Sequence, residues 1–257
     1  MRIKLYLSLF IITLFCSNKL KAESINVAWN PWCPWMCDSD EKPGLSVEIV
    51  ENAFKSQEID VQFQKYNWAL AVSEVRDGKI NGLLAPAKLE APDFIFPKEP
   101  VAYQQMCFYV KKDSTWEYKS IDSLKNISIA ISQGAHYPGL MEYINKNSDK
   151  KNKIKNISTE DLFTIGFKNL LNNTYQALVL DYVTSDYYLK KNDLIDQVKK
   201  VGCLKTEYLY FALSPKNKEK SLKLSRIFDE YIANYKSTDF YQKLYDKYNV
   251  ENWSQKK

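Results

Sequence analysis

The 257-residue chain contains one histidine, His136, and three arginines, Arg2, Arg76 and Arg226. A lone histidine excludes a metal site built from several histidines. The sequence also lacks a nucleophile elbow and an evident catalytic triad. These absences argue against an enzyme, although paired carboxylates, which can perform acid–base chemistry, keep that class open.

The first 22 residues carry four basic residues and no acidic one, and an apolar run from Leu5 to Phe15 precedes the small Ala22. This pattern is typical of a secretory signal peptide. The run is shorter than the roughly 20 residues that span a bilayer. Residues 13–15 lack the small side chains that a lipoprotein signal places before Cys16. We therefore predict that residues 1–22 are a signal peptide, cleaved near Ala22 to give a soluble product.

Loss of this leader lowers the formal net charge from +5 to +1, because its four basic residues have no acidic counterparts. Nucleic-acid binding needs a basic patch, so the mature protein offers no electrostatic reason to bind nucleic acid. The apolar content of 45% suffices for one large or two medium domains.

Four cysteines follow the leader, at Cys33, Cys37, Cys107 and Cys203. An even number in an oxidising compartment favours disulfides over metal binding. Three pairings are possible, and proximity favours Cys33 with Cys37, which leaves Cys107 with Cys203. The short bridge would restrain the unfolded chain by about 2 kcal/mol and the long one by roughly 4 to 5. We interpret the short bridge as a device that shapes its loop, with a plain stability staple as the alternative.

Strand-like and helix-like periods alternate from residue 25 onward. Strands predicted at 25–30, 59–66 and 79–87 enclose helices that begin at residues 45 and 68, an order that favours a mainly parallel sheet. A long strand-like segment at 101–113 then leads to a second series of strands and helices. Another such segment, 203–215, precedes two closing helices. The chain is thus expected to build one lobe, cross to a second, and return.

Several motifs share this order and spacing: "NPWCPWMC" and "GLSVEIV", "YNWALAVSEVRDGKING", "FIFPKEPV", "ISIAISQGAHY", "ALVLDY" and "DFYQKLYDKYNVENW". Together, over residues 23–253, they resemble the type II periplasmic solute-binding proteins of family 3, whose members usually bind polar amino acids for ABC importers. The resemblance implies an α/β fold of two lobes, each a mainly parallel sheet flanked by helices, joined by two crossing strands. Proteins of this kind close by hinge bending around a ligand in the cleft.

The resemblance also implies the division of the chain. Lobe 1 would take residues 23–104 plus 208–257, and lobe 2 residues 105–207, with crossings near 101–111 and 205–214. Cys107 and Cys203 would then lie beside the two crossings, where a bond between them would tie the hinge-side strands together.

The aromatic loop after the first strand is the first candidate for ligand contact. Such a loop stands at the carboxyl end of a parallel sheet, where open α/β sheets place ligands. Trp32 and Trp35 would offer flat faces that attract planar groups or cations by roughly 0.5 to 2 kcal/mol. The neighbouring prolines and the short disulfide would limit the ordering cost on binding. Either tryptophan could belong to the core instead.

Other candidates follow later strands. Asp181 matches the acidic residue that in the family takes a ligand ammonium group, and a cap on the next helix is the alternative. His136 and Tyr137 stand at a predicted helix start, where backbone N–H groups favour anions and ordinary solvation is the alternative. Tyr103 and Gln104, at the first crossing, could face the guest. Trp68 begins its helix and would serve as core or cleft wall.

One departure from the family concerns the segment "LLAPAKLEAPDFIF" at 83–96. Amino-acid binders of this branch usually carry Thr-x-x-Arg there, with the arginine clamping the ligand carboxylate. Here the nearest basic residue is Lys88, which cannot reproduce the planar fork of arginine, and Glu90 adds the opposite charge. A cleft of acidic residues and tryptophans would suit a cationic or aromatic solute better than an α-amino acid.

We therefore expect non-catalytic capture of a small polar, amino-acid-like solute in the periplasm. A monomer without cofactor or metal would present its closed form to an inner-membrane ABC permease. The alternatives are a sensor or accessory module that reports to a membrane receptor, and a small lyase or dehydratase on the same fold.

Overall fold

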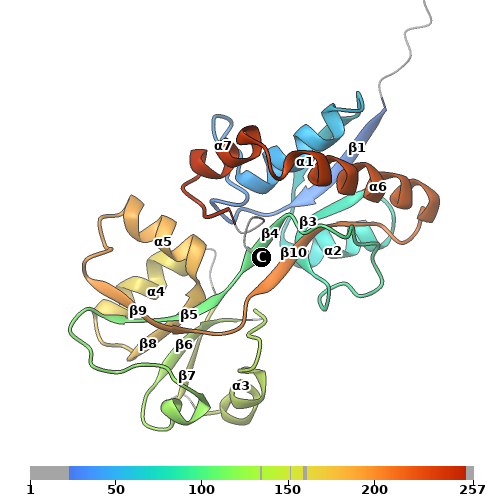
Figure 1. Cartoon of the computed structure of the whole chain (residues 1–257). Coiled ribbons are helices and arrows are strands. Elements are labelled where there is room, and N and C mark those ends of the chain that lie inside the picture. The colour runs from blue at the N-terminus through green and yellow to red at the C-terminus, as the bar shows by residue number, and fades with distance from the viewer. Residues whose placement is uncertain (1–22, 134, 151, 159–160, 253–257) are drawn as a thin grey trace, which may run out of the picture.

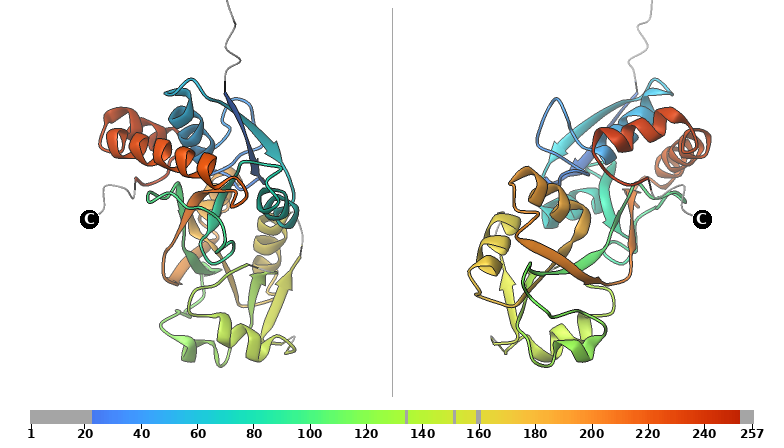
Figure 2. Two further views of the ribbon diagram at one scale, coloured as in Figure 1. Left: turned by 90° about the vertical axis from the view of Figure 1, so that its right-hand side faces the viewer. Right: turned by 60° about the vertical axis from the view of Figure 1, so that its left-hand side comes forward.

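The structure is a computed structural model that describes residues 23–133, 135–150, 152–158 and 161–252. The predicted signal peptide lies outside the described residues. Two α/β lobes lie one above the other and are joined by extended segments (Figures 1 and 2).

The first lobe is a five-stranded sheet in the order β2-β1-β3-β10-β4. Strand β1 pairs in parallel with β2 and β3, whereas β10 runs antiparallel to β3 and β4. Its strands are β1 (Ser24–Trp29), β2 (Asp60–Lys65), β3 (Gly82–Ala87), β4 (Ala102–Gln104) and β10 (Glu207–Leu213), and its helices are α1 (Leu45–Lys55), α2 (Trp68–Arg76), α6 (Lys218–Tyr235) and α7 (Asp239–Lys247).

The second lobe is a five-stranded sheet in the order β7-β6-β8-β5-β9. Strand β6 is parallel to β7 and β8, and β5 is antiparallel to β8 and β9. Its strands are β5 (Met106–Lys111), β6 (Ile129–Ser132), β7 (Ile154–Ile157), β8 (Ala177–Asp181) and β9 (Val198–Cys203), and its helices are the 3-10 turn η1 (Ile121–Leu124), α3 (Met141–Asn147), α4 (Leu162–Leu171) and α5 (Tyr182–Lys191).

The element pattern confirms the α/β interpretation of the sequence. Helix α1 buries an apolar stripe that includes Leu45, Ile49 and Ala53 in the core of the first lobe. Strand β7 was not predicted, because its four residues, "IKNI", follow a Lys/Asn-rich stretch and offer too few apolar positions to show a period. The first long strand-like segment divides into β4 and β5, since the chain leaves one sheet and joins the other midway. The second, 203–215, contains β10 and only the last residue of β9, so most of β9 was not predicted.

The two crossings lie at Gln105, between β4 and β5, and at 204–206, between β9 and β10. Backbone and side-chain hydrogen bonds link them: Leu204 N–H donates to Met106 O at 2.8 Å, and Gln105 Nε2 donates to Leu204 O at 2.9 Å. Glu207 pairs with Gln104 in the first sheet, one residue before the lobe boundary expected from the sequence. These few residues connect the two sheets.

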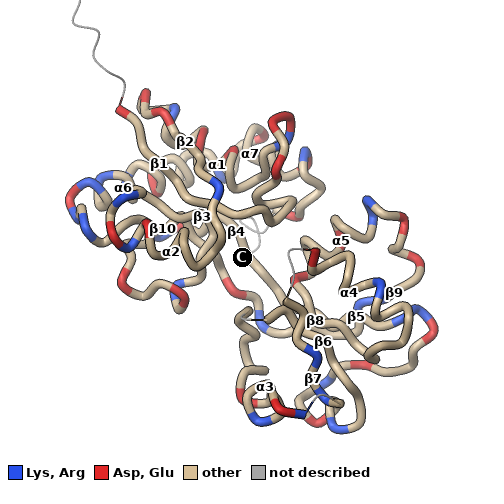
Figure 3. Tube along the Cα trace, turned by 180° about the vertical axis from the view of Figure 1, so that it is seen from behind, with Lys and Arg blue, Asp and Glu red and all other residues tan. Residues whose placement is uncertain are grey.

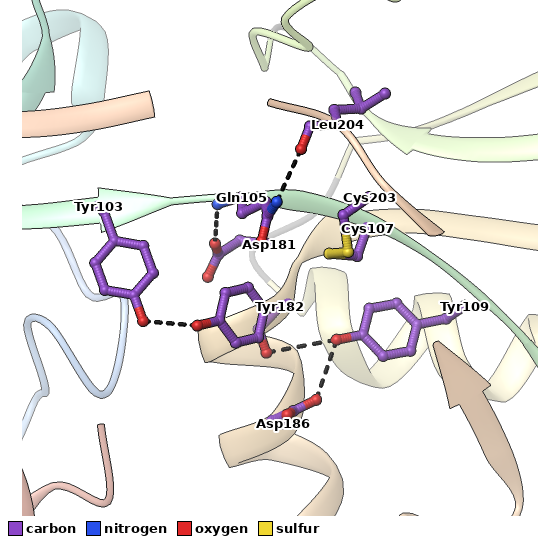
Figure 4. Close-up of a disulfide and its surroundings, with 9 residues drawn as sticks. All are labelled: Tyr103, Gln105, Cys107, Tyr109, Asp181, Tyr182, Asp186, Cys203 and Leu204. Atoms are coloured by element: carbon purple, nitrogen blue, oxygen red, sulfur yellow. Dashed lines mark hydrogen bonds between the residues drawn. A yellow bond between two sulfur atoms is a disulfide. The ribbon is translucent and has the colours of Figure 1, made fainter. Parts of the chain in front are cut away.

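Both disulfides are present, in the pairing that proximity favoured. Cys33 bonds Cys37 in the loop after β1, and Cys107 bonds Cys203 between directly paired residues of β5 and β9. The second bond lies immediately beside the crossings and holds the lobe 2 ends of both crossing segments together (Figure 4).

Charge is mixed over the surface. Lysines and arginines alternate with aspartates and glutamates around both lobes (Figure 3). In the described part of the chain, every helix is too short or too polar to span a bilayer.

Candidate ligand-binding site between the lobes

The loop after β1 is held from several directions. The Cys33–Cys37 bond closes it, and Trp32 N–H donates to Met36 O at 2.7 Å. Gly44, at its end, has a φ of 118° and donates its N–H to the Tyr248 hydroxyl at 3.0 Å. The loop therefore has a fixed conformation before any ligand binds.

The loop tryptophans take different positions. Trp35 is fully buried, and its ring meets the ring of Tyr103 edge-on at 5.2 Å between centroids. Trp32 is only partly buried and lies 6.5 Å from Trp35. Tyr137, a third aromatic candidate, is also in a core and accepts a hydrogen bond from Ser132 N–H at 2.7 Å. Of these three rings, Trp32 alone retains surface for a guest.

Asp181 is 3% exposed and caps helix α5. Its Oδ2 accepts hydrogen bonds from the backbone N–H and the hydroxyl of Thr184, at 3.0 and 2.9 Å. Its Oδ1 accepts from Gln105 N–H at 3.0 Å, so the carboxyl group also anchors the first crossing (Figure 4). Burial raises its pKa to about 6, although these hydrogen bonds act in the opposite direction. The helix-capping alternative describes its role in this structure.

Four polar side chains from the two lobes interact through hydrogen bonds or through their charges; we call them the inter-lobe polar cluster. They are Glu90 from the loop after β3, Gln104 from β4, Glu207 from β10, and His136 from the loop after β6. Glu207 Oε2 accepts from Gln104 Nε2 at 2.8 Å and lies 3.3 Å from His136 Nδ1. The cluster thus joins residues of lobe 1, a crossing strand and lobe 2.

The surroundings of Glu90 in the cluster raise the pKa of its carboxyl group. Its residue is exposed to solvent, yet neighbouring protein atoms partly desolvate the carboxyl group and raise its pKa, and the charge of Glu207 adds to this effect. A hydrogen bond from Ala87 N–H, at 2.8 Å, favours the charged form in part. Two carboxylates that raise each other's energy would both be stabilised by a cation placed between them.

A backbone irregularity precedes Glu90. Ala85 has a φ of 63°, in the left-handed region that residues other than glycine seldom adopt. The pairing of β3 with β10 shifts register at the same place. Such irregularities re-aim the side chains that follow and gather at functional sites.

Lys88 and Trp68 both contact aromatic or apolar residues of lobe 1. The ammonium group of Lys88 stands over the ring of Tyr210, 4.4 Å from its centroid, and 6.0 Å from that of Phe96. Trp68 is partly buried against the same small core as Phe96. The Lys88 ammonium group thus already occupies the position over the Tyr210 ring that a cationic ligand would otherwise take.

Three of the ten residues predicted from the sequence as ligand contacts, Glu90, Gln104 and His136, come together. Sequence reasoning missed Glu207, which joins them. The sequence feature that could have indicated Glu207 is its position on the second crossing segment, opposite Gln104 on the first. Among the described residues, no three His, Cys, Asp or Glu side chains are placed to hold a metal ion.

Comparisons with solved structures show the same fold. An ABC uptake transporter substrate-binding protein from Streptococcus pneumoniae with bound histidine superposes with a TM-score of 0.69 at 16% identity, over 89% of this chain and 93% of that one. A histidine kinase sensor domain similar to periplasmic binding proteins gives 0.68 at 18% identity, over 88% and 95%. An ancestral arginine-binding protein bound to arginine gives 0.66 at 20% identity, over 88% and 97%.

No curated protein sequence matches the chain. The family model for bacterial extracellular solute-binding proteins, family 3, matches residues 25–251, which is nearly all of the described structure. On this match, the chain belongs to the bacterial extracellular solute-binding proteins, family 3.

Proposed function

We propose that this protein captures a small, polar, positively charged solute between its lobes in the periplasm and presents it, as a monomer, to an inner-membrane ABC importer. The observation that carries the proposal is the inter-lobe polar cluster, in which Glu207 lies 3.3 Å from His136 and the charges of both act on the carboxyl group of Glu90. Neither arginine of the described residues belongs to this cluster, since Arg76 pairs with Asp93 and Arg226 lies in α6.

Capture without chemistry is the proposed mode of action. The solute enters while the lobes are apart, contacts Glu90 on lobe 1 and His136 on lobe 2, and stabilises the closed form by bridging them. The crossings at Gln105 and 204–206 supply the hinge. Turnover of a bound compound by the purified protein would contradict this mode and favour a lyase or dehydratase.

A sensor role is the second candidate, supported by the likeness to a histidine kinase sensor domain. Both roles need the same ligand-driven closure and differ in the partner that recognises the closed form. Co-purification of the closed protein with a permease complex, rather than with a receptor, would favour import.

Titration calorimetry with L-arginine, L-lysine and putrescine, against L-glutamine and L-glutamate, tests the ligand class. At least one of the three cationic compounds should bind, and L-glutamate should not. Glu90→Gln and Glu207→Gln should each weaken binding by roughly 10- to 100-fold, the range for hydrogen bonds to charged groups. Glu230→Gln, at an exposed position of α6, is the matched control and should bind like the wild type. Equal affinity in all three variants would show that the polar cluster is not the site.

A further inference from the structure

A cavity lies between the lobes, and its volume is about 540 Å³. Lobe 1 contributes Tyr103 and Tyr248 to its wall, and helix α5 of lobe 2 contributes Tyr182 and Tyr187. We call it the tyrosine pocket. Its lining includes residues of α5 and residues 248–251, which follow α7, and Figure 1 shows α5 and α7 on the same side of the crossing strands. Its volume is within the range of roughly 300 to 1,000 Å³ that small-molecule sites occupy.

The tyrosine pocket is separate from the inter-lobe polar cluster. Tyr103 and Gln104 are consecutive residues of β4, and successive side chains of a strand point to opposite faces. Tyr103 lines the pocket, whereas Gln104 donates to Glu207 in the cluster. The two sites therefore lie on opposite faces of the crossing strands.

The walls of the pocket are fixed by hydrogen bonds. The hydroxyls of Tyr103 and Tyr182 lie 2.7 Å apart (Figure 4). The Tyr248 hydroxyl accepts from Gly44 N–H at 3.0 Å and donates to the Glu48 carboxylate. Rings held in this way lose little freedom when a guest packs against them, which favours binding.

Two lysines give the pocket a place for an anionic group. Lys190 and Lys191, in the last turn of α5, are exposed and line the pocket, and neither forms an ion pair with another described residue. The lining also carries two acidic residues, Glu251 and Asp186, of which Asp186 accepts a hydrogen bond from the Tyr109 hydroxyl at 3.1 Å. The two ammonium groups are therefore the part of the wall that a carboxylate would contact.

We propose that the tyrosine pocket is a second ligand site and that it takes a small aromatic carboxylate. The ring of such a guest would pack among the tyrosines, with the carboxylate at Lys190 and Lys191. This guest has the opposite charge to the solute proposed for the polar cluster, so the two sites discriminate by sign as well as by position.

Saturation-transfer NMR and calorimetry with 3-phenylpropionate test the site in the full-length mature protein. Binding is expected for 3-phenylpropionate, and weaker binding for 3-cyclohexylpropionate, which keeps the charge without the flat ring. Phenethylamine, which carries the opposite charge, should not compete. Absence of 3-phenylpropionate binding up to about 10 mM, a weaker affinity than specific sites usually show, would overturn the proposal.

Two double lysine variants test where 3-phenylpropionate binds. Lys190→Gln with Lys191→Gln should weaken 3-phenylpropionate binding about tenfold or more. The double variant Lys218→Gln with Lys243→Gln changes the net charge equally at exposed positions outside the pocket and should leave binding unchanged.

Two further variants distinguish this pocket from the polar cluster. Tyr187→Ala should weaken binding, whereas Tyr235→Ala, at an exposed tyrosine of α6, should not. Glu90→Gln with Glu207→Gln should retain 3-phenylpropionate binding. Loss of binding in that last variant, with retention in the lysine variant, would place the guest in the polar cluster and contradict a second site.

Discussion

The hydroxyl oxygen of Tyr103 on β4 lies 2.7 Å from that of Tyr182, the first residue of α5, so a hydrogen bond joins the two lobes beside their crossing strands. The rings stand 6.1 Å apart, and the Tyr103 ring also packs against Trp35 in the lobe 1 core. Any rotation of one lobe against the other must change this contact.

Tyr103→Phe removes the inter-lobe hydroxyl and keeps the ring that packs on Trp35. We expect the lobes to shift toward more open arrangements by about 1 kcal/mol, the net contribution of an ordinary hydrogen bond. Small-angle scattering of the unliganded protein would detect the increase in radius of gyration. Tyr143→Phe is the control, because its hydroxyl bonds Leu124 O within lobe 2, at 3.2 Å, and its loss should leave the scattering unchanged. An unaltered profile for Tyr103→Phe would mean that this bond does not hold the lobes.

Gly44 can be replaced to test how the aromatic loop is fixed. Its φ is 118°, and a Cβ there would overlap the carbonyl oxygen of Trp35. Gly139 has a φ of 81° with open space around its Cβ position. Gly44→Ala should therefore cost about 3 kcal/mol or more in unfolding free energy, whereas Gly139→Ala should cost only about 1 to 2. Denaturant titration would measure both, and equal losses would show that the overlap with Trp35 is relieved at no cost.

The pH dependence of stability tests the burial of Asp181. Its pKa is raised to about 6 by burial, above the ordinary 3.8, so between these values the folded state binds more protons than the unfolded state. The contribution of Asp181 to the free energy of unfolding is therefore largest at low pH and decreases as the pH rises through 6.

Asp181→Asn cannot titrate, and it isolates that contribution. The difference in unfolding free energy, wild type minus variant, should fall by about 2 to 3 kcal/mol between about pH 4 and pH 7. Chemical denaturation of both proteins at several pH values gives the comparison. A flat or rising difference would show that Asp181 is not desolvated.

The two disulfides should contribute unequally to stability. Cys107 and Cys203 are separated by 96 residues, and Cys33 and Cys37 by 4. The loop-entropy model gives roughly 4 to 5 kcal/mol for the long closure and about 2 for the short one. Thermal unfolding of the two double Cys→Ser variants should therefore show the larger loss at the long bridge. Equal losses would mean that local strain or residual structure outweighs chain entropy.

The architecture could be predicted from the sequence because the spacing of apolar residues distinguishes helices from strands along most of the chain. The stripe on α1 and the alternating strands specify elements, and the family motifs order them into two lobes. The crossings were located through the same motifs. Strands β7 and β9 were not predicted, since the four residues of β7 include two polar positions and β9 carries two consecutive lysines, so neither shows a clear period.

The site was harder to predict because contact across a gap is a tertiary property. Trp35 and Trp32 belong to one loop with similar chemistry, yet one turns into the core and the other remains partly exposed. Glu207 reaches His136 only because the returning segment pairs with β4 at Gln104. No local pattern distinguishes Glu207 from other acidic residues in strands.

Native mass spectrometry of the mature protein, taken from its producing cells without denaturation, tests the central claim most directly. We predict that the wild type retains a small, polar, positively charged compound, which is released on unfolding and is absent from the Glu90→Gln/Glu207→Gln double variant. An anionic guest, or one that the double variant retains equally, would contradict capture of a cation by the carboxylates between the lobes.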